Sequence, residues 1–360
     1  MEKYRSIRDL KFRLKATNVL TGPNGCGKSN LYNSLFLLSK AAEGGLAKAI
    51  VEEGGMDSIL WAGKWLLQER RRVQIAVEMD KFSYALSCGL PQPGNSQFNL
   101  DPEVKEEFVW LTGKRRPSNT MFERSSSGTW IRDREGARVS YTGKLLPTES
   151  VLSQLREPHL YPELSELRSA MNQWRFYHHF RTDASSPLRQ PQVGVRTPVL
   201  SHDGNDLAAA LQTIFETGDG GTLRETICEA FSGASLFVDS EGSRFQTFLQ
   251  MRGLQRPLGA QELSDGTLRY LCLAASLLSP RPPSLLALNE PETSLHPDLL
   301  KPLAKLIARA SQSTQLWVTT HSRALAEYIE EFSGDRPVEL HLMDGETRIV
   351  GQGLVLPDDD

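Results

Sequence analysis

Residues 22–29 read Gly22-Pro23-Asn24-Gly25-Cys26-Gly27-Lys28-Ser29 and match the pattern G-x-x-x-x-G-K-[S/T]. A strand-like segment, residues 15–21, precedes the motif. Helical spacing follows it over residues 28–43, through Leu31, Leu35, Leu38 and Ala42. The motif has meaning only between a strand and a helix, and here it has that setting. Its glycines let backbone N–H groups surround a phosphate at the helix N-terminus. The sequence therefore predicts a phosphate-binding loop.

Two side chains of this loop have expected roles. Lys28 is expected to neutralise β- and γ-phosphate oxygens, and the Ser29 hydroxyl to bind Mg²⁺. The expected nucleotide-binding residues of this region are Gly22, Pro23, Asn24, Gly25, Cys26, Gly27, Lys28, Ser29 and Asn30.

A second group of motifs lies beyond residue 260. The run Glu262-Leu263-Ser264-Asp265-Gly266-Thr267 opens a predicted helix over 265–278, where Ser-Asp alone would be simply a good N-cap. The apolar strand 285–288 ends in Asn289-Glu290-Pro291-Glu292, and strand ends of this kind bind ligands in open α/β sheets. A later strand, 314–319, ends in Thr320-His321-Ser322.

The rest of the pattern alternates between sheet and helix. Residues 4–21 indicate two short strands, 73–141 an antiparallel meander, and 150–232 a mainly helical region with a Pro- and Arg-rich connector at 181–198. The remaining predicted elements are strands at 235–250, helices at 297–311 and 322–331, and a strand near 338–343. Helices alternating with strands toward the end of the chain predict a parallel sheet with crossovers.

Composition excludes several protein classes. The 360 residues, 39% hydrophobic and 24% charged, allow one large domain or about two of roughly 150 residues, and exclude disordered and disulfide-rich chains. The net charge of −3 argues against bulk coating of nucleic acid, although 28 of the 41 cations are Arg. Four dispersed cysteines and the lack of an apolar leader or membrane span predict a cytoplasmic protein without membrane association.

Taken in order, these motifs resemble those of ABC-type ATPases of the SMC/RecF-like branch, close to the ATPases grouped with RecF and the OLD family. The resemblance covers essentially the whole chain. It implies an α/β fold, an ABC-type P-loop NTPase head with an antiparallel β lobe and a helical lobe. Both ends of the chain would combine in one head over 1–360. Its parts would be a Walker A part (1–72), a β meander (73–149), a helical insertion lobe (150–259) and a part with the signature, Walker B, D-loop and switch His (260–360).

The resemblance also implies roles for individual residues. In a head-to-tail homodimer, Ser264 and Gly266 would contact the γ-phosphate bound by the opposite subunit's loop. Glu290 would polarise the attacking water and His321 would sense the γ-phosphate, so the implied catalytic set is Glu290, His321 and Lys28, with ATP and Mg²⁺ as cofactors. Ser294 and His296 lie in the loop that crosses the dimer interface in relatives.

Two of the implied site residues, Arg5 and Gln154, have an alternative interpretation, and a third, Asn289, departs from the family pattern. Arg5, followed by Ser6, resembles an Arg-Ser pair that contacts nucleotide phosphates in SMC-type heads, but an exposed strand arginine fits equally well. Gln154 is expected to be the glutamine that couples Mg²⁺ to the arm lobe, and Gln68 is its competitor. Asn289 stands where the family has Asp. The implied metal set is therefore Ser29, Gln154 and Asn289, with weaker Mg²⁺ binding and slow, switch-like hydrolysis.

Ser264 lies 235 positions after Ser29, farther than in a transporter cassette, and the residues between them lack the heptads of a coiled coil. From the short stretch after His321 we also expect this chain to lack the nuclease domain that OLD proteins carry. Candidate DNA-binding runs are 69–72, 114–116 and the aromatic stretch 174–181, each with the alternative of solvated charge or an apolar strand. Two functions follow: a DNA-associated ATPase in repair, recombination or defence against mobile DNA, or a nucleotide-gated switch for a separate effector protein.

Overall fold

Segments from opposite ends of the sequence combine in each of two units in the computed structural model, which describes residues 1–92, 95, 97–133 and 135–351. Unit 1 contains Met1–Arg13, Pro23–Gln173 and the segment that begins at Leu340. Unit 2 contains Leu14–Gly22 and Trp174–Glu339. Among the described residues, no helix has both the length and the apolar character needed to cross a membrane.

Unit 2 is built on a parallel sheet with the strand order β10-β15-β16-β3-β17. These strands are β10 (Arg175–Tyr177), β15 (Leu285–Asn289), β16 (Gln315–Thr319), β3 (Thr17–Thr21) and β17 (Val338–Met343), whose first two residues belong to this unit. The whole of β15 is buried, which agrees with its uninterrupted apolar run. Because the strands are parallel, the carboxyl ends of β3, β16 and β15 lie at one edge of the sheet.

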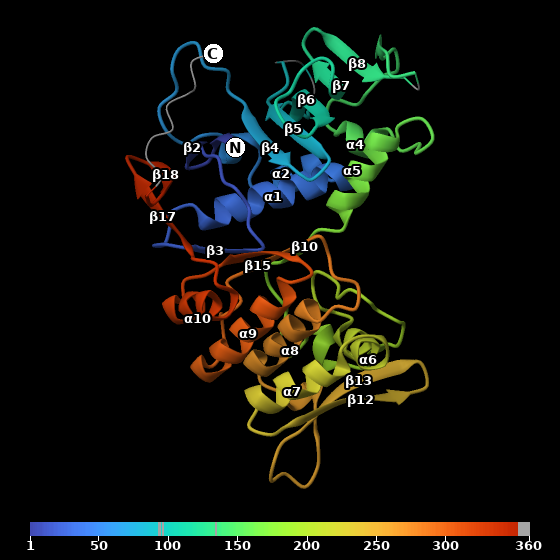
Figure 1. Cartoon of the computed structure of the whole chain (residues 1–360), viewed down its shortest axis with the longest axis vertical. Helices are drawn as coiled ribbons and strands as arrows, with labels where there is room; N and C mark the ends of the chain where they lie inside the picture. Colours follow the sequence, from blue (N-terminus) through green and yellow to red (C-terminus); the bar gives the residue numbers. More distant parts are fainter. Residues whose placement is uncertain (93–94, 96, 134, 352–360) are drawn as a thin grey trace. The chain divides into compact units, whose positions relative to one another are not determined.

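Three helices pack together on one side of this sheet (Figure 1). They are α8 (Asp265–Leu277), α9 (Leu300–Ala310) and α10 (Arg323–Ser333). In α9 the buried residues Leu300, Leu303, Leu306 and Ile307 recur at helical spacing, so one face of the helix is apolar. The side chains of Ser264 and Ser322 cap the N-termini of α8 and α10. Together with residues of β15 and β16 these helices form the core of unit 2.

A second, smaller sheet in unit 2 packs against two further helices. Its strand order is β11-β13-β12, and β14 also pairs with β13. The elements of this region are β11 (Gln192–Val193), β12 (Ser235–Glu241), β13 (Arg244–Gln250), β14 (Leu258–Gly259), α6 (Leu207–Thr217) and α7 (Gly220–Ala230). Short 3₁₀ helices occur at η1 (Pro187–Arg189), η2 (Ala260–Glu262) and η3 (Pro297–Leu299).

Unit 1 is built on an eight-stranded antiparallel sheet with the order β2-β1-β4-β5-β6-β7-β8-β9. Its strands are β1 (Glu2–Tyr4), β2 (Ile7–Asp9), β4 (Val73–Glu78), β5 (Phe82–Gly89), β6 (Glu103–Leu111), β7 (Thr120–Ser125), β8 (Gly128–Arg132) and β9 (Arg138–Ser140). The helices of the unit are α1 (Lys28–Glu43), α2 (Leu46–Glu52), α3 (Met56–Ile59), α4 (Val151–Gln154) and α5 (Pro162–Asn172). The end of β17 pairs here with β18 (Glu346–Ile349).

The structure confirms most of the predicted elements, including the meander, the helix over 28–43 and the alternating strands and helices beyond 265. Of the two strands predicted in 4–21, the second is confirmed as β3, whereas residues 2–9 form an antiparallel pair of strands in place of the first. The predicted helical lobe 150–259 also contains strands, and the boundary between the units falls inside it, between Gln173 and Trp174. The aromatic stretch at 174–181 includes β10, which extends the parallel sheet beside β15.

Candidate functional site

The loop from Gly22 to Gly27 lies between β3 and α1, as the motif predicts. Gly25 and Gly27 have φ angles of 78° and 102°, in the left-handed region that side chains disfavour. Gly27 is the N-cap of the 16-residue helix α1 and has no side chain with which to cap the first backbone N–H groups. The first turn also contains no acidic residue. This helix terminus therefore fits an anion such as a phosphate.

Lys28 lies within the loop. Its side chain is 4% exposed, and its Nζ donates to the carbonyl oxygen of Pro23 at 3.0 Å. The neighbouring Ser29 is exposed at the start of α1, whereas Cys26 is buried. The loop thus holds the Lys28 ammonium group against its own backbone. This cation lies at the N-terminus of α1, which is suited to an anion. The residues present fit a bound nucleotide phosphate, with Ser29 available to a metal ion.

Thr347, a buried residue of β18, packs against this loop. A Cβ placed on Gly27 would come within 2.1 Å of the Thr347 Oγ1, so no larger residue fits at Gly27. Thr347 Oγ1 lies 2.7 Å from Ser6 Oγ, which also accepts from Asn30 Nδ2 at 2.8 Å. Sequence reasoning missed Thr347, because nothing in the sequence near residue 347 indicates a contact with residue 27.

Arg5 has a partner of its own in unit 1. Its guanidinium lies 2.8 Å from the carboxylate of Glu53 and donates to the Glu53 carbonyl oxygen at 3.5 Å. Its backbone φ of 49° places it at the turn between β1 and β2. Contact between Arg5 and a nucleotide stays a prediction, and any such contact would compete with the Glu53 pair.

At the carboxyl edge of the unit 2 sheet, Glu290 and His321 face one another. Glu290 follows β15, His321 follows β16, and the Glu290 Oε1 lies 2.9 Å from the His321 Nε2. Both side chains are partly exposed, at 35% and 38%. The structure therefore brings together two of the three predicted catalytic side chains within one unit. Such a pair of acid–base groups can hold or pass a proton at this edge.

Asn289 is buried at the end of β15. Its Oδ1 accepts a hydrogen bond from the Thr319 Oγ1 at 2.7 Å. An amide oxygen can still accept from a metal-bound water, but it lacks the negative charge of the aspartate that the family places here. The geometry is thus compatible with a role in Mg²⁺ binding and leaves that role a prediction.

The signature residues are positioned by contacts within unit 2. The Ser264 Oγ accepts from the Thr267 backbone N–H at 3.1 Å and lies 2.8 Å from the Thr267 Oγ1. A Cβ on Gly266 would come within 2.5 Å of the Ser294 carbonyl oxygen, so the D-loop packs directly against the start of α8. Ser294 has a φ of 64°, and His296 caps η3.

Arg189, which sequence reasoning did not single out, supports the segment before Ser264. Its guanidinium donates to the Leu263 carbonyl oxygen at 2.7 Å and to the Asp265 Oδ1 at 2.6 Å. It also donates to carbonyl oxygens of Thr182 and Asp183 on the connector that follows β10. The proline- and arginine-rich composition of the connector gave no indication of this contact, which joins residues far apart in the sequence.

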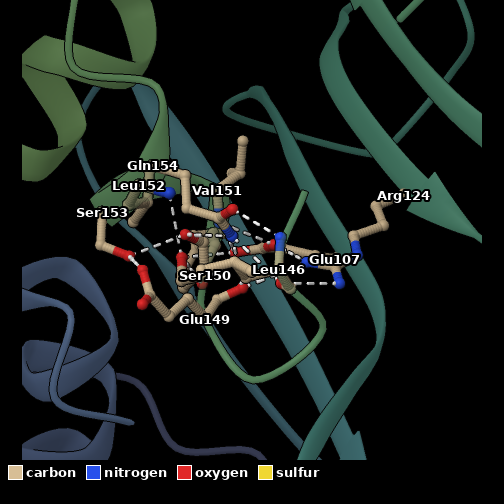
Figure 2. A network of polar contacts seen from close by, with 10 residues as sticks. Glu107, Arg124, Leu146, Glu149, Ser150, Val151, Leu152, Ser153 and Gln154 are labelled. Carbon is tan, nitrogen blue, oxygen red and sulfur yellow. Dashed lines mark hydrogen bonds and ion pairs between the residues drawn. The ribbon is translucent and has the colours of Figure 1, made fainter. Parts of the chain in front are cut away.

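Gln154 lies at the end of α4 in a closed network of polar contacts (Figure 2). Its Oε1 accepts from the Leu146 N–H at 2.7 Å, and its Nε2 donates to carbonyl oxygens of Leu146 and Glu149. The carboxamide is thus used to fix the loop that precedes α4. A role for Gln154 in metal binding stays a prediction, as does that of its competitor Gln68, which is exposed.

The anchor of this network is Glu107 on β6, whose side chain is fully buried. Its carboxylate accepts from the hydroxyls of Tyr84 and Ser150, at 2.7 and 2.5 Å, and from the Val151 N–H. Burial raises the pKa of the Glu107 carboxyl, and these donors together with Arg124 act in the opposite direction. A meander strand therefore fixes the start of α4 and, with it, the position of Gln154.

The aromatic run is buried, whereas the two short cationic runs stay exposed at Arg71, Lys114 and Arg116 and make only some contacts inside the protein. In the aromatic stretch, the side chains of Trp174, Phe176, Tyr177 and Phe180 are buried, so the alternative of an apolar strand holds and a stacking surface is excluded there. Arg70 and Arg72 both pair with Glu106, at 3.2 and 2.8 Å. Arg115 lies 3.7 Å from the centre of the Phe108 ring.

Comparison with known proteins agrees with the motifs. A family model described as "AAA domain, putative AbiEii toxin, Type IV TA system" matches residues 100–327, which do not include the loop at 22–29. No curated protein matches the sequence. A crystal structure of an Smc head bound to the C-winged helix domain of ScpA is 14% identical with a TM-score of 0.53, covering 98% of this chain and 96% of that one.

A second solved structure, an Smc head domain with a coiled coil and joint from Pyrococcus yayanosii, is 10% identical with a TM-score of 0.51. It covers 98% of this chain and 96% of that one. At these identities the likeness concerns the fold. The fold is that of an SMC head, an ABC-type P-loop NTPase head with an antiparallel β lobe and a helical lobe.

Gly266→Ala tests the contact between α8 and the D-loop. Alanine normally stabilises a helix by about 1 kcal/mol relative to glycine. At Gly266 the added Cβ meets the Ser294 carbonyl oxygen at 2.5 Å, so we expect the free energy of unfolding to fall by about 1–3 kcal/mol. Urea denaturation measures this change.

The matched control is Gly221→Ala, at the second residue of α7, where the new Cβ would lie 3.5 Å from the Asp219 Oδ1. We expect this variant to be as stable as the parent or more so. Equal stability gains in the two variants would contradict a tight contact at Gly266.

Proposed function

We propose that this chain, which belongs to the AAA-domain family whose model matches residues 100–327, binds ATP at the loop 22–29 and hydrolyses it slowly. The observation that carries the proposal is the loop itself. It presents the uncapped N-terminus of α1 together with the buried cation of Lys28. The Glu290 and His321 pair supports hydrolysis, because it supplies a base beside a group that can bind a phosphate oxygen.

Mg²⁺, when bound, would neutralise charge on the β- and γ-phosphates. Ser29 and Asn289 are the residues proposed to hold it, with Gln154 as a third. Asn289 offers an oxygen but no charge, and that oxygen already accepts from Thr319 at 2.7 Å. Weak metal binding of this kind supports slow turnover rather than fast catalysis.

We further propose that two heads associate head to tail on ATP, with Ser264 and Gly266 of one subunit completing the site of the other. The support lies in the start of α8, where Ser264 is exposed beside the helix N-terminus. Arg189 holds this segment in place through its contacts with Leu263 and Asp265. An exposed, rigid helix start is suited to a phosphate presented by a second copy of the chain.

Lys28→Ala tests the phosphate-binding loop. Because it removes the cation nearest to the expected phosphates, we expect ATP affinity to fall by at least about tenfold. Isothermal titration calorimetry with ATP and Mg²⁺ measures the affinity. The control is Lys40→Ala in the last turn of the same helix, which should bind ATP like the parent. Unchanged ATP affinity in Lys28→Ala would show that the loop is not the nucleotide site.

Glu290→Gln tests ATP-driven association, since a variant that binds ATP without hydrolysing it should accumulate as a dimer. Size-exclusion chromatography with light scattering, with and without ATP and Mg²⁺, gives the mass. The control is Glu290→Gln with Ser264→Asp. Aspartate caps a helix as well as serine does, but its charge repels a phosphate, so this chain should stay monomeric. A monomeric Glu290→Gln variant with ATP bound would contradict the dimer.

Two cellular roles are compatible with such an ATPase. The resemblance to SMC and RecF heads supports a DNA-associated role in repair, recombination or defence against mobile DNA. The description of the family as a component of a type IV toxin–antitoxin system supports a nucleotide-gated switch that acts with a separate effector protein. The burial of the aromatic stretch and the pairing of Arg70 and Arg72 with Glu106 favour the switch.

An ATPase assay with and without single- and double-stranded DNA separates the two roles. A switch without DNA contact should turn over well below about 10 s⁻¹ and should not respond to DNA. Stimulation by DNA that weakens steeply as salt rises would instead establish the DNA-associated role, because displaced counterions make such binding salt-dependent. Turnover near about 10 s⁻¹ without DNA would contradict a slow switch.

A further inference from the structure

We propose that Arg269 and Glu292 couple α8, the helix that begins at the signature motif, to the loop that carries His321. The proposal rests on the proposed ATPase function and adds two positioning residues to it. Both belong to unit 2, and both act through neighbouring residues rather than through nucleotide. The coupling would make the position of His321 depend on the state of the Ser264 segment.

Glu292 fixes the loop after β16. Its Oε1 accepts three hydrogen bonds, from the Thr320 Oγ1 at 2.6 Å, the His321 N–H at 2.8 Å and the Ser322 N–H at 3.2 Å. Hydrogen bonds to an ionised carboxylate are among the stronger ones in proteins. They hold the backbone from which the His321 imidazole extends toward Glu290. Loss of Glu292 would therefore release the His321 side chain from its position.

Arg269 reaches the same edge of the sheet from α8. It is 5% exposed, and it lies five positions after Ser264 along the chain. Its Nη2 donates to the carbonyl oxygen of Glu290 at 3.0 Å, and its Nη1 lies 3.4 Å from the His179 Nδ1. Glu290 itself has a φ of 46°, so its carbonyl points in a direction that an ordinary strand end does not allow. A displacement of α8 would thus move a cation that holds the Glu290 backbone.

One buried hydrogen-bond donor and one buried acceptor lie in this region without a partner. Within the described part of the chain, the Nε of Arg269 and the Oε2 of Glu292 are both buried without a hydrogen-bond partner. Buried polar groups are normally paired. A conformational change that gave each of these atoms a hydrogen-bond partner would therefore be favourable. Burial lowers the pKa of the Arg269 guanidinium, and the charge of Glu292 opposes this more than that of Glu290 does.

These contacts form one chain of interactions. Arg269 joins α8 to the Glu290 backbone, Glu290 joins His321 through its side chain, and Glu292 joins the backbone of the His321 loop. When the Ser264 segment engages a phosphate, a shift of α8 can bring Arg269 and Glu292 together and satisfy both unpaired atoms. The His321 loop would then respond to the signature motif within the same subunit.

The first test needs no nucleotide. It compares the ring ¹⁵N NMR signals of His321 in the full-length parent with those in Glu292→Gln, Arg269→Met and the double variant, assigned from a His321→Gln spectrum. We expect all three variants to shift these signals. The informative variant is Arg269→Met, because Arg269 does not touch His321 among the described contacts. The control is Glu327→Gln, at an exposed position of α10, which should leave the signals unchanged.

The second test measures turnover and thermal stability of the same variants. Each single variant should lower kcat by about tenfold or more while ATP affinity changes by less than about threefold, since Lys28 and its loop are untouched. The double variant removes both buried charges, so its melting temperature should recover relative to the single variants. Its kcat should remain as low as that of the less active single variant. If the two residues act as a unit, removing either one already abolishes the coupling, and removing the second lowers kcat no further.

Several results would overturn the coupling. One is an unchanged His321 signal in Arg269→Met, and another is a kcat that recovers together with the melting temperature in the double variant. Arg269→Lys, which keeps the charge but shortens the side chain, replaces Arg269→Met if that variant does not fold, with the same expected shift. A parent protein without ATP turnover would overturn the proposed ATPase function, whereas the His321 signals would still decide the coupling.

Discussion

The pairing of β3 with β16 is the constraint on which the rest of unit 2 depends. It joins residues 17–20 to residues 316–319 in parallel register, and Asn18 strengthens it with a side-chain bond to the Leu316 carbonyl oxygen. Because β15 continues the sheet in the same direction, the ends of three strands are aligned at one edge. Glu290 and His321 face each other because β15 and β16 pair in register, with Asn289 opposite Thr319. The phosphate-binding loop begins where β3 ends, so the same pairing also fixes the point at which the chain enters it.

Carboxyl groups position short backbone segments in both units. Glu107 in unit 1 holds the start of α4, and Glu292 in unit 2 holds the loop after β16. Glu107 accepts from the Val151 N–H and Glu292 from the N–H groups of His321 and Ser322, and each short segment would otherwise be free to change conformation. Arg189 and Arg269 do the corresponding work with carbonyl oxygens. The abundance of arginine over lysine in the sequence agrees with this use, because the guanidinium can donate to several oxygens in fixed directions.

Sequence patterns predicted the fold class and most elements, because the P-loop, the apolar strand 285–288 and the alternating strands each follow from local spacing. They also placed Glu290 and His321 at strand ends, which the parallel sheet then brought together. They could not predict Thr347 against Gly27, Arg189 against Leu263 or Arg269 against Glu290, because each contact joins segments whose relation depends on tertiary packing. The buried strand β10 was one of two interpretations of its aromatic residues, since alternating aromatics and cations also fit a stacking surface. For Arg5 the sequence left a nucleotide contact and an exposed strand arginine both open, and the structure pairs it with Glu53.

The discontinuous make-up of both units has a consequence for biosynthesis. The segment that forms β3 leaves the ribosome some 300 residues before its partner strand β16, a delay of roughly 15–60 s at about 5–20 residues per second. During that interval its backbone N–H and C=O groups and the apolar side chains of Val19 and Leu20 have no native partner. In unit 1 the delay is longer, because Thr347 must be synthesised before it can pack on Gly27. Residues 17–20 therefore stay without their partner strand until residues 316–319 have been made.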